Sequence, residues 1–505
     1  MQIEPQATAF AKRYARGEAQ VVWTTLVSDL ETPVSAFLKI AGTRPLSFLL
    51  ESVEGGALRG RYSIIGLNPD LVWRTIAGRA EINRRSQQSM HSFTPCSEPA
   101  LAALRALIAE SRIELPDVLP PMAAGIFGYL GYDMVRLMEE LPPPNPDPIG
   151  IPDAMLVRPS VVVVFDTVKD VITVVTPVRP ESGVSAEAAL RRASERLSAV
   201  VDALDAPLAH APPEVHAGPL TVWPSSNVAP AEYERMVDVA KEYIAAGDIF
   251  QVVLSQRFEA PFELPPFALY RALRRVNPAP FLYFLDFGGF SIAGSSPEIL
   301  VRVREGTVTI RPLAGTRSRG ATLEQDKALE AELLADEKER AEHLMLLDLG
   351  RNDVGRVARS ASVKVTDQFF IERFSQVMHI VSNVEGQLDG KYDALDALAA
   401  GFPAGTVSGA PKVRAMQIID ELEPQKRGIY AGSVGYFSAA GELDSCIVLR
   451  TALIKDGMMY VQAGAGIVAD SNPQAEQQEC VDKAKALFRA AEEAKRFASA
   501  ARRGQ

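Results

Sequence analysis

The stretch Phe402-Pro403-Ala404-Gly405-Thr406-Val407-Ser408-Gly409-Ala410-Pro411-Lys412 holds two prolines, two glycines, two hydroxyl side chains and one lysine. Glycine lets a backbone approach a ligand closely, and proline fixes the path of a loop. The residues that follow have the spacing of a helix over 411–421. A polar loop that leads into a helix favours an anionic ligand, although an ordinary tight turn explains the same residues.

The whole chain has the size and composition of a folded protein with more than one core. Its 505 residues predict two domains, with one large fused α/β unit as the alternative. Hydrophobic residues make up 47% and charged residues 23%, which is ordinary for a water-soluble protein. The net charge of −10 argues against a nucleic-acid or membrane-surface binder, so an acidic ligand must be neutralised locally.

The three cysteines, Cys96, Cys446 and Cys480, lie far apart and form no Cys-x-x-Cys pair. A disulfide framework or a zinc site is therefore not expected, and a reducing cytoplasm fits. Residues 1–18 lack the apolar segment of a signal peptide, and no apolar run has membrane-spanning length. These features predict a cytoplasmic protein.

Hydrophobic periodicity divides the chain into an N-terminal region over 20–176, a helix and linker over 177–224, and a second region over 225–490. Short strands alternate with helices in a way that predicts a largely antiparallel α+β fold. The pattern predicts strands over 46–52, 61–66, 161–165, 171–175, 249–258, 281–286, 299–303, 308–311, 433–437, 447–454 and 459–463. It predicts helices over 100–110, 185–204, 231–246, 325–350, 393–400, 411–421 and 473–497, and a linker over 206–219 that contains His210 and His216.

Two Glu-x-x-Glu pairs, Glu339 with Glu342 and Glu476 with Glu479, fall in predicted helices. Residues three apart share a helix face, so each pair aims two carboxylates at one point. If the two helices converge, the carboxylates form an all-oxygen site that suits Mg²⁺. Solvated acidic helix faces are the alternative.

Other polar residues stand where they could contact an anion or move a proton. Arg450 follows the apolar run 447–449, from which a guanidinium can be aimed rigidly, and Gly464-Ala465-Gly466 is expected to form a loop with an anion-binding nest. Glu298 lies in a turn before a strand and could donate a proton if burial raises its pKa. His379 lies in a strand-like segment, where a structural role is the alternative.

Taken together, these separated motifs resemble the chorismate-utilising enzymes over residues 225–490, and more weakly over 20–170. The resemblance implies large antiparallel sheets flanked by helices, with an N-terminal regulatory part packed on a C-terminal catalytic part. It implies that Glu342 and Glu479 bind Mg²⁺ directly, with Glu339 and Glu476 as neighbours. It assigns Glu298 the role of general acid and His379 a role in aromatisation. The positions that it matches to chorismate binding are Gly315, Thr316, Thr406, Tyr430, Arg450, Gly464, Ala465, Gly466 and Lys483.

Two positions discriminate between branches of the family. The isochorismate and salicylate synthases carry a lysine that activates water where this chain has Gln251, and glutamine is a poor base. Aminodeoxychorismate synthases carry a lysine where this chain has Ala314. Both residues favour the anthranilate synthase branch, a lyase reaction of chorismate with ammonia that opens tryptophan biosynthesis. Aminodeoxychorismate synthase and a silent effector-binding protein are the alternatives. Because no glutaminase nucleophile is evident, a separate glutamine amidotransferase subunit is implied.

A second resemblance concerns feedback inhibition by tryptophan. The segments 49–52 and 277–282 resemble the two halves of the family's tryptophan site. The resemblance implies that Glu51 and Ser52 hold the polar end of tryptophan. Pro280, Phe281 and Leu282 would line the indole pocket, with Cys446 nearby. Cys446 and Arg450 are expected on one strand, which would couple this pocket to the substrate. A buried strand and a proline turn explain the same segments.

Overall fold

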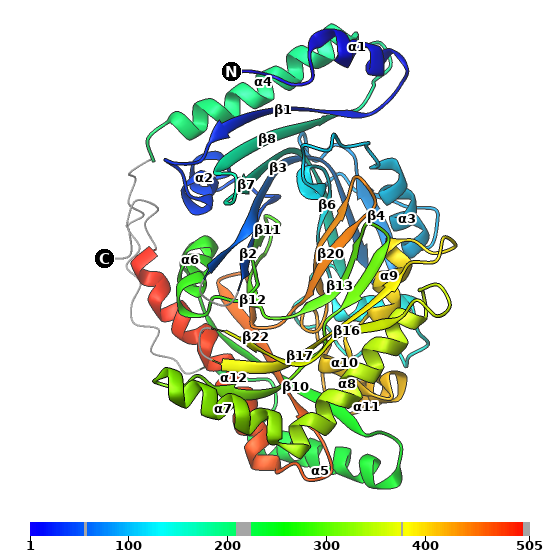
Figure 1. Cartoon of the computed structure of the whole chain (residues 1–505), viewed down its shortest axis with the longest axis vertical. Coiled ribbons are helices and arrows are strands. Elements are labelled where there is room, and N and C mark those ends of the chain that lie inside the picture. The colour runs from blue at the N-terminus through cyan, green and yellow to red at the C-terminus, as the bar shows by residue number, and fades with distance from the viewer. Residues whose placement is uncertain (55–57, 209–223, 375–376, 498–505) are drawn as a thin grey trace.

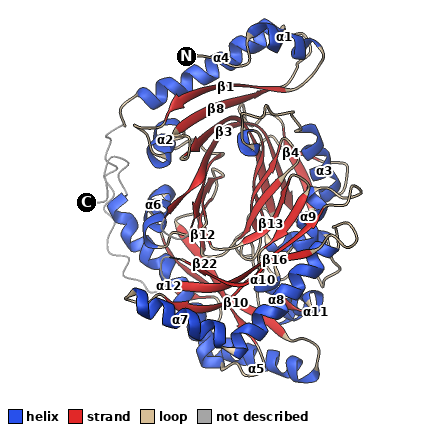
Figure 2. Ribbon diagram, viewed as in Figure 1, coloured by secondary structure: helices blue, strands red, loops and turns tan. Residues whose placement is uncertain are grey.

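The computed structural model describes residues 1–54, 58–208, 224–374 and 377–497. Strands gather in the interior of the molecule and helices lie around them (Figure 2). Helices α1 and α4 lie at one end of the molecule, and α5, α7, α8 and α11 lie at the other (Figure 1). Residues 209–219 of the predicted linker, including His210 and His216, lie outside the described ranges.

Every pairing among the described strands is antiparallel, which confirms the predicted α+β class. The N-terminal region contributes helices α1 (Ala7–Ala15), α2 (Pro33–Ile40), α3 (Ala100–Glu110) and α4 (Ala186–Asp205), with the 3-10 turns η1 (Pro121–Ala123) and η2 (Tyr132–Leu137). Its strands are β1 (Gln20–Val27), β2 (Ser47–Glu54), β3 (Leu58–Ile76), β4 (Arg79–Asn83), β5 (Thr94–Pro95), β6 (Gly125–Leu130), β7 (Ala154–Asp166) and β8 (Val171–Val178).

The second region contributes the remaining elements. Its strands are β9 (Ser225–Ser226), β10 (Gln251–Pro261), β11 (Phe281–Asp286), β12 (Ser291–Ser296), β13 (Ile299–Arg304), β14 (Thr307–Ile310), β15 (Leu313–Ser318), β16 (Lys364–Arg373), β17 (Val377–Gln387), β18 (Gly409–Ala410), β19 (Ser433–Ser438), β20 (Leu443–Ile447), β21 (Thr451–Lys455) and β22 (Met458–Ile467). Its helices are α5 (Pro230–Ala246), α6 (Pro266–Val276), α7 (Leu323–Ala335), α8 (Glu337–Gly355), α9 (Ala394–Gly401), α10 (Gly405–Ser408), α11 (Lys412–Leu422), α12 (Pro473–Glu493) and η3 (Ala494–Phe497).

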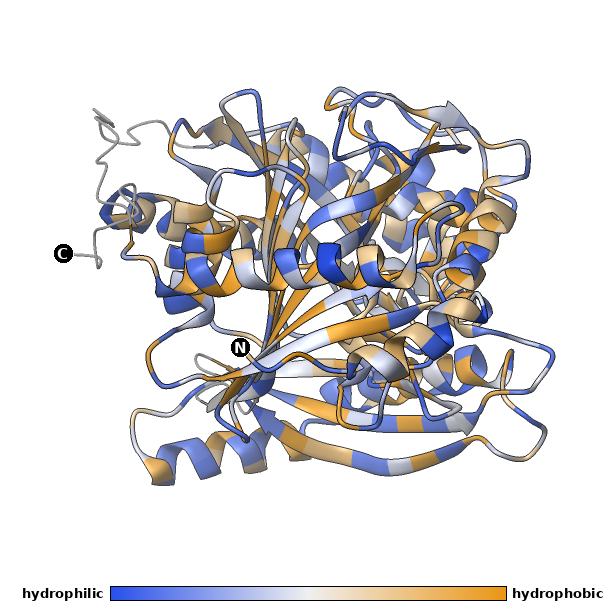
Figure 3. Ribbon diagram, turned by 90° about the horizontal axis from the view of Figure 1, so that it is seen from above, coloured by the Kyte–Doolittle hydropathy of each residue, from blue (hydrophilic) through white to orange (hydrophobic). Residues whose placement is uncertain are grey.

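Strand pairing joins the two regions of the chain. Strand β2 pairs with β11, and β6 pairs with β19, so N-terminal strands lie directly beside strands of the second region. Helices carry both hydrophobic and hydrophilic residues along their length (Figure 3). One large cluster of buried apolar side chains draws on both regions, from Phe10 to Phe497. The two regions therefore share sheet and core.

Two predicted elements are wrong because of local backbone geometry. The helix expected over 325–350 is two helices, since Asp336 takes an extended conformation and accepts from the N–H groups of Lys338 and Glu339 as the cap of α8. The strand expected over 447–454 breaks after Ile447, and Arg450 lies in a turn with φ of +48°. Cys446 and Arg450 therefore do not share a strand.

The expected glycine loop at 464–466 is also wrong. Residues Gly464, Ala465 and Gly466 lie within β22 and pair with β10. A strand orders its N–H groups in a ladder, so these three residues do not form a loop-type nest.

Candidate active site

Four carboxylates from two helices face a common region. Glu339 and Glu342 lie on α8, and Glu476 and Glu479 lie on α12. Burial raises the pKa of Glu342, and the charges of Glu339 and Glu479 raise it further. Burial and the charge of Glu479 likewise raise the pKa of Glu476. These mutual effects place the two pairs within electrostatic range of each other.

Each of three carboxylates has a polar partner. Gln251 on β10 donates to Glu342 at 3.0 Å. Lys483 lies 2.7 Å from Glu479, and Arg317 lies 2.9 Å from Glu339. Across the described ranges, no three His, Cys, Asp or Glu side chains are grouped closely enough to hold a metal ion. The acidic side chains lie near one another, but three of them are hydrogen-bonded or ion-paired to these partners and not grouped around a common point.

His379 on β17 is a buried, neutral imidazole with one nitrogen free. Its Nδ1 lies 3.0 Å from the carbonyl oxygen of Gly315 and 3.0 Å from Thr316 Oγ1. Because a carbonyl only accepts, Nδ1 carries the proton and Nε2 carries the lone pair. Nε2 is buried and has no hydrogen-bond partner among the residues that the structure describes. Burial lowers the pKa of His379 to about 4, and the charges of Arg450 and Lys483 contribute.

Gly315 connects this imidazole to the acidic helices. Its φ of +75° lies in the left-handed region that favours glycine. A β-carbon placed on Gly315 would lie 3.2 Å from a carboxylate oxygen of Glu339. The strand that orients His379 therefore runs directly beside α8.

Glu298 lies in the turn between β12 and β13 and is 6% exposed. Burial raises its pKa to about 8, while bonds from Thr406 and from the Leu313 N–H oppose the shift. Thr406 Oγ1 on α10 donates to Glu298 at 3.1 Å. At neutral pH this side chain is a protonated carboxylic acid, which is the state that a proton donor requires.

Arg450 is a half-buried cation that forms no ion pair with the described residues. Burial lowers the pKa of its guanidinium. Arg450 affects the pKa of His379, as does Lys483, so the three groups lie near one another. An unpaired buried guanidinium is costly, and a carboxylate ligand would neutralise it and accept two hydrogen bonds.

The remaining substrate-binding predictions fall around β22. Lys483 donates to the carbonyl oxygen of Gly464 at 2.8 Å. A β-carbon on Gly464 would lie 2.8 Å from the hydroxyl of Tyr430, and one on Gly466 would lie 2.7 Å from the amide nitrogen of Gln251. The glycines therefore leave room for neighbouring polar side chains. Lys412, by contrast, is held by Asp353 at 2.9 Å.

The six residues expected to bind tryptophan do not lie on one face. Glu51 accepts from Arg274 Nε at 2.7 Å and also from Tyr270, both on α6. Leu282 packs in the same core as α6. Phe281 and Cys446 belong to a second apolar cluster on the other face of the sheet. Ser52 lies opposite Phe281 in the β2–β11 pair, so its side chain points to the same face of the sheet as Phe281. Its hydroxyl donates to the Tyr62 carbonyl oxygen at 3.0 Å.

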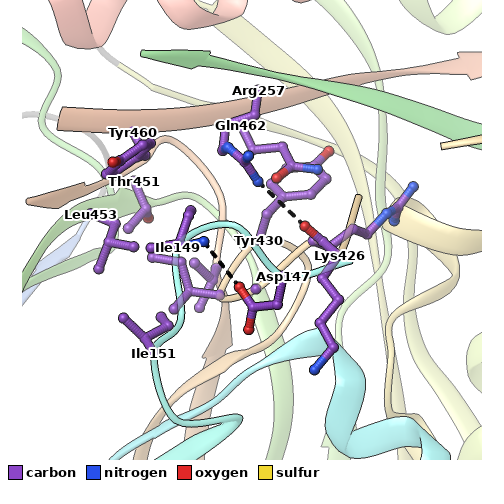
Figure 4. Close-up of a pocket in the computed structure, with 14 residues that line it drawn as sticks. Asp147, Ile149, Ile151, Arg257, Lys426, Tyr430, Thr451, Leu453, Tyr460 and Gln462 are labelled. Carbon is purple, nitrogen blue, oxygen red and sulfur yellow. Dashed lines mark hydrogen bonds between the residues drawn. The ribbon is translucent and has the colours of Figure 1, made fainter. Parts of the chain in front are cut away.

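Sequence reasoning missed the buried residues beneath the site. Arg427 donates to Glu423, and the side chains of both are almost fully buried. A pocket lies beside this pair, and Tyr430 is among the residues that line it. Arg257 and Gln462 lie on one side of the pocket, and Ile151 and Leu453 lie on the other (Figure 4). The only sequence signal was an i, i+4 Glu-Arg spacing, which is usually a surface feature.

Comparison with known proteins shows the class of enzyme to which this fold and this set of polar groups belong. The model of the chorismate binding enzyme family matches residues 63–489, and the chain belongs to that family. It is 58% identical over 503 residues to anthranilate synthase component 1 of Cereibacter sphaeroides, which covers 98% of this chain and 99% of that protein. It is 48% identical to anthranilate synthase component 1 of Aquifex aeolicus, over 93% of this chain and 94% of that protein.

Solved structures agree on the fold. The crystal structure of anthranilate synthase component I from Streptococcus pneumoniae matches with a TM-score of 0.74 and 39% identity, over 92% of this chain and 98% of that chain. The menaquinone-specific isochorismate synthase from Escherichia coli matches with a TM-score of 0.70 at 20% identity, over 96% of this chain and 100% of that chain. The second match supports the fold alone.

The protonation state of Glu298 can be measured directly. We expect its carboxyl carbon, followed by ¹³C NMR in glutamate-labelled protein, to titrate near pH 8, because burial destabilises the charged form. Comparison with Glu298→Gln identifies the signal. Glu139, a partly exposed partner of Arg356, offers the matched variant Glu139→Gln, which should leave that signal in place. A Glu298 titration near pH 4.5 would contradict the proposed acid.

Proposed function

We propose that this chain catalyses the reaction of an anthranilate synthase component 1, which converts chorismate and ammonia to anthranilate and pyruvate. The observation that carries the proposal is a pair of buried groups with opposite proton status, Glu298 and His379. The first holds a proton at neutral pH and the second has a free lone pair. Gln251, in place of a lysine that activates water, supports ammonia as the nucleophile.

The residues take the following roles in this proposal. Arg450 binds a carboxylate of chorismate, since its half-buried guanidinium forms no ion pair with the described residues. Glu298 protonates the ring hydroxyl, so that the C–O bond breaks and water leaves as the C–N bond to ammonia forms. His379 Nε2 accepts the ring proton as pyruvate is eliminated and the ring becomes aromatic. The substrate is oriented by the side chains of Lys483, Tyr430, Thr406 and Thr316 and by the backbone of Gly315, Gly464, Ala465 and Gly466.

We also propose Mg²⁺ as the cofactor. Glu342 and Glu479 would hold it, with Glu339 and Glu476 as neighbours. The donor set is all-oxygen, as Mg²⁺ prefers, and the charges of neighbouring carboxylates add to the burial that raises the pKa values of Glu342 and Glu476. A hard divalent cation would relieve that part of the shift that comes from repulsion between the carboxylates. These carboxylates would thereby place a positive charge against the carboxylate on the ring of chorismate. Gln251 would orient Glu342 through the hydrogen bond already described.

Ammonia would come from a separate glutamine amidotransferase subunit. Burial raises the pKa of the Cys446 thiol and raises that of Cys480 to about 11, so neither thiol is a ready nucleophile. Burial also raises the pKa of Cys96. We further propose a cytoplasmic location, and none of the described helices is long and apolar enough to cross a membrane.

Feedback inhibition by tryptophan is a further part of the proposal. The site would lie on the side of Ser52, Phe281 and Cys446, because Glu51 is already paired with Arg274. A link to Glu298 exists through the backbone. Ile447, which follows Cys446, donates to the Glu298 carbonyl oxygen at 3.0 Å. An effector that shifts β20 would thereby move the acid.

The reaction is tested with the purified chain, chorismate, MgCl₂ and an ammonium salt. We expect anthranilate fluorescence to appear together with pyruvate. Glu342→Gln and Glu479→Gln should each lower kcat/KM by at least about 100-fold, since a ligand to the ion is lost. The matched control Glu421→Gln alters an acid that contacts Tyr243 away from the site, and should keep wild-type activity. Pyruvate-free turnover, or near-normal activity of both site variants, would contradict the proposal.

Tryptophan inhibition tests the effector site separately. We expect wild-type activity to fall as tryptophan is added, and Ser52→Phe to need at least about tenfold more tryptophan, because the larger ring fills the pocket. Ser47→Ala on the same strand, whose hydroxyl donates to the Arg44 carbonyl at 2.8 Å, is the control and should respond as wild type does. Equal inhibition of all three proteins would remove Ser52 from the effector site.

A further inference from the structure

A cavity of about 180 Å³ lies in the N-terminal region, far along the chain from the catalytic residues. It is bounded by helix α4 and by β7 and β8, at the end of the molecule where α1 and α4 lie (Figure 1). Arg179, Arg192 and Arg196 line it, together with the polar side chains of Tyr14, Gln87 and Ser160. The volume is several times the roughly 30 Å³ share of one water molecule, so a small organic molecule fits.

Two of these arginines are half-buried without a carboxylate partner. In the part of the chain that the structure describes, neither Arg179 nor Arg196 forms an ion pair, and the Nε atom of each is buried with no hydrogen-bond partner. Arg179 Nη2 donates to the Ser111 carbonyl oxygen at 3.2 Å. Burial lowers the pKa of Arg196 and lowers that of Arg179 to about 10. Both guanidiniums remain charged at neutral pH.

No acid among the described residues forms an ion pair with Arg179 or Arg196, although the charge of Asp70 acts on both guanidiniums. Asp70 lines the cavity but binds Arg158 through two hydrogen bonds of 2.8 and 2.9 Å. Glu181 is exposed and lies 3.7 Å from Arg192. Arg179 and Arg196 therefore contribute two positive charges to the lining of this cavity, and neither charge forms an ion pair with a described residue. Desolvated cations of this kind are costly unless an anion pairs with them.

We propose that this cavity is a binding site for a small molecule with at least two negative charges, a phosphate monoester or a dicarboxylate. Arginine forks bind both groups with paired hydrogen bonds. The site shares no residue with the proposed active site or effector site. Binding of an anion in this cavity therefore does not depend on which reaction the chain catalyses.

Thermal unfolding of the full chain tests the site, with sodium phosphate and sodium succinate as probes at constant ionic strength. We expect at least one probe to raise Tm saturably, by about 2–4 °C, because a ligand that binds only the folded state stabilises it. Arg196→Gln should abolish the rise. This variant should fold, because no ion pair with a described residue is lost. A response to phosphate alone assigns a phosphate monoester, and a response to succinate alone assigns a dicarboxylate.

Arg191→Gln is the matched control. Arg191 lies on the same helix, its side chain is 65% exposed, and its ion pair with Glu195 is 4.0 Å long. It should keep the full response. Phosphate also stabilises proteins without binding, through exclusion from their surface. An equal rise in Arg196→Gln and Arg191→Gln would therefore overturn the proposal, as would no saturable rise in the wild type. Arg179→Gln should also abolish the rise in Tm, and it gives a second, independent test of the site.

Discussion

The buried ion pair between Arg427 and Glu423 is the constraint on which the geometry of the site depends. Arg427 donates to the carbonyl oxygens of Val407 at 2.7 Å and Val253 at 2.6 Å, and also to Glu423. Glu423 in turn accepts from the backbone and hydroxyl of Ser255, both at 2.8 Å. One guanidinium thus joins α10, which carries Thr406, to β10, which carries Gln251. Because the pair is inside the protein, loss of either partner would leave an uncompensated charge.

Burial also sets the opposite proton states of the two groups assigned to the chemistry. Removing a carboxyl from water favours its neutral, protonated form, and removing an imidazole from water favours its neutral, unprotonated form. The same physical cause therefore gives Glu298 a proton to donate and leaves His379 Nε2 able to accept one. The positive charges near His379 add to this effect, and they belong to Arg450 and Lys483, which the proposal assigns to substrate binding.

Local patterns in the sequence predicted most elements, because apolar periodicity and caps are local properties. The helix expected over 231–246 is observed at Pro230–Ala246, and it ends at Gly247 with a left-handed cap. The break at Arg450 follows from a positive φ, a backbone feature that apolar periodicity does not reveal. Other failures depend on contacts between distant segments, and the strand at Gly464 follows from pairing with Ser255. The partners of Glu51 and Lys412, which are Arg274 and Asp353, are likewise remote in sequence, so no local signal could reveal that these charges are occupied.

Hydrogen–deuterium exchange of Arg427→Lys is the measurement that tests the central claim most directly. Lysine keeps the charge but cannot reproduce the fork that reaches Val253, Val407 and Glu423 together. The account predicts faster exchange in residues 251–255 and 405–408, with β1 and β8 unchanged, and no such effect in Arg235→Lys, whose pair with Glu232 is on the surface. Wild-type exchange throughout 251–255 and 405–408 in Arg427→Lys would contradict it.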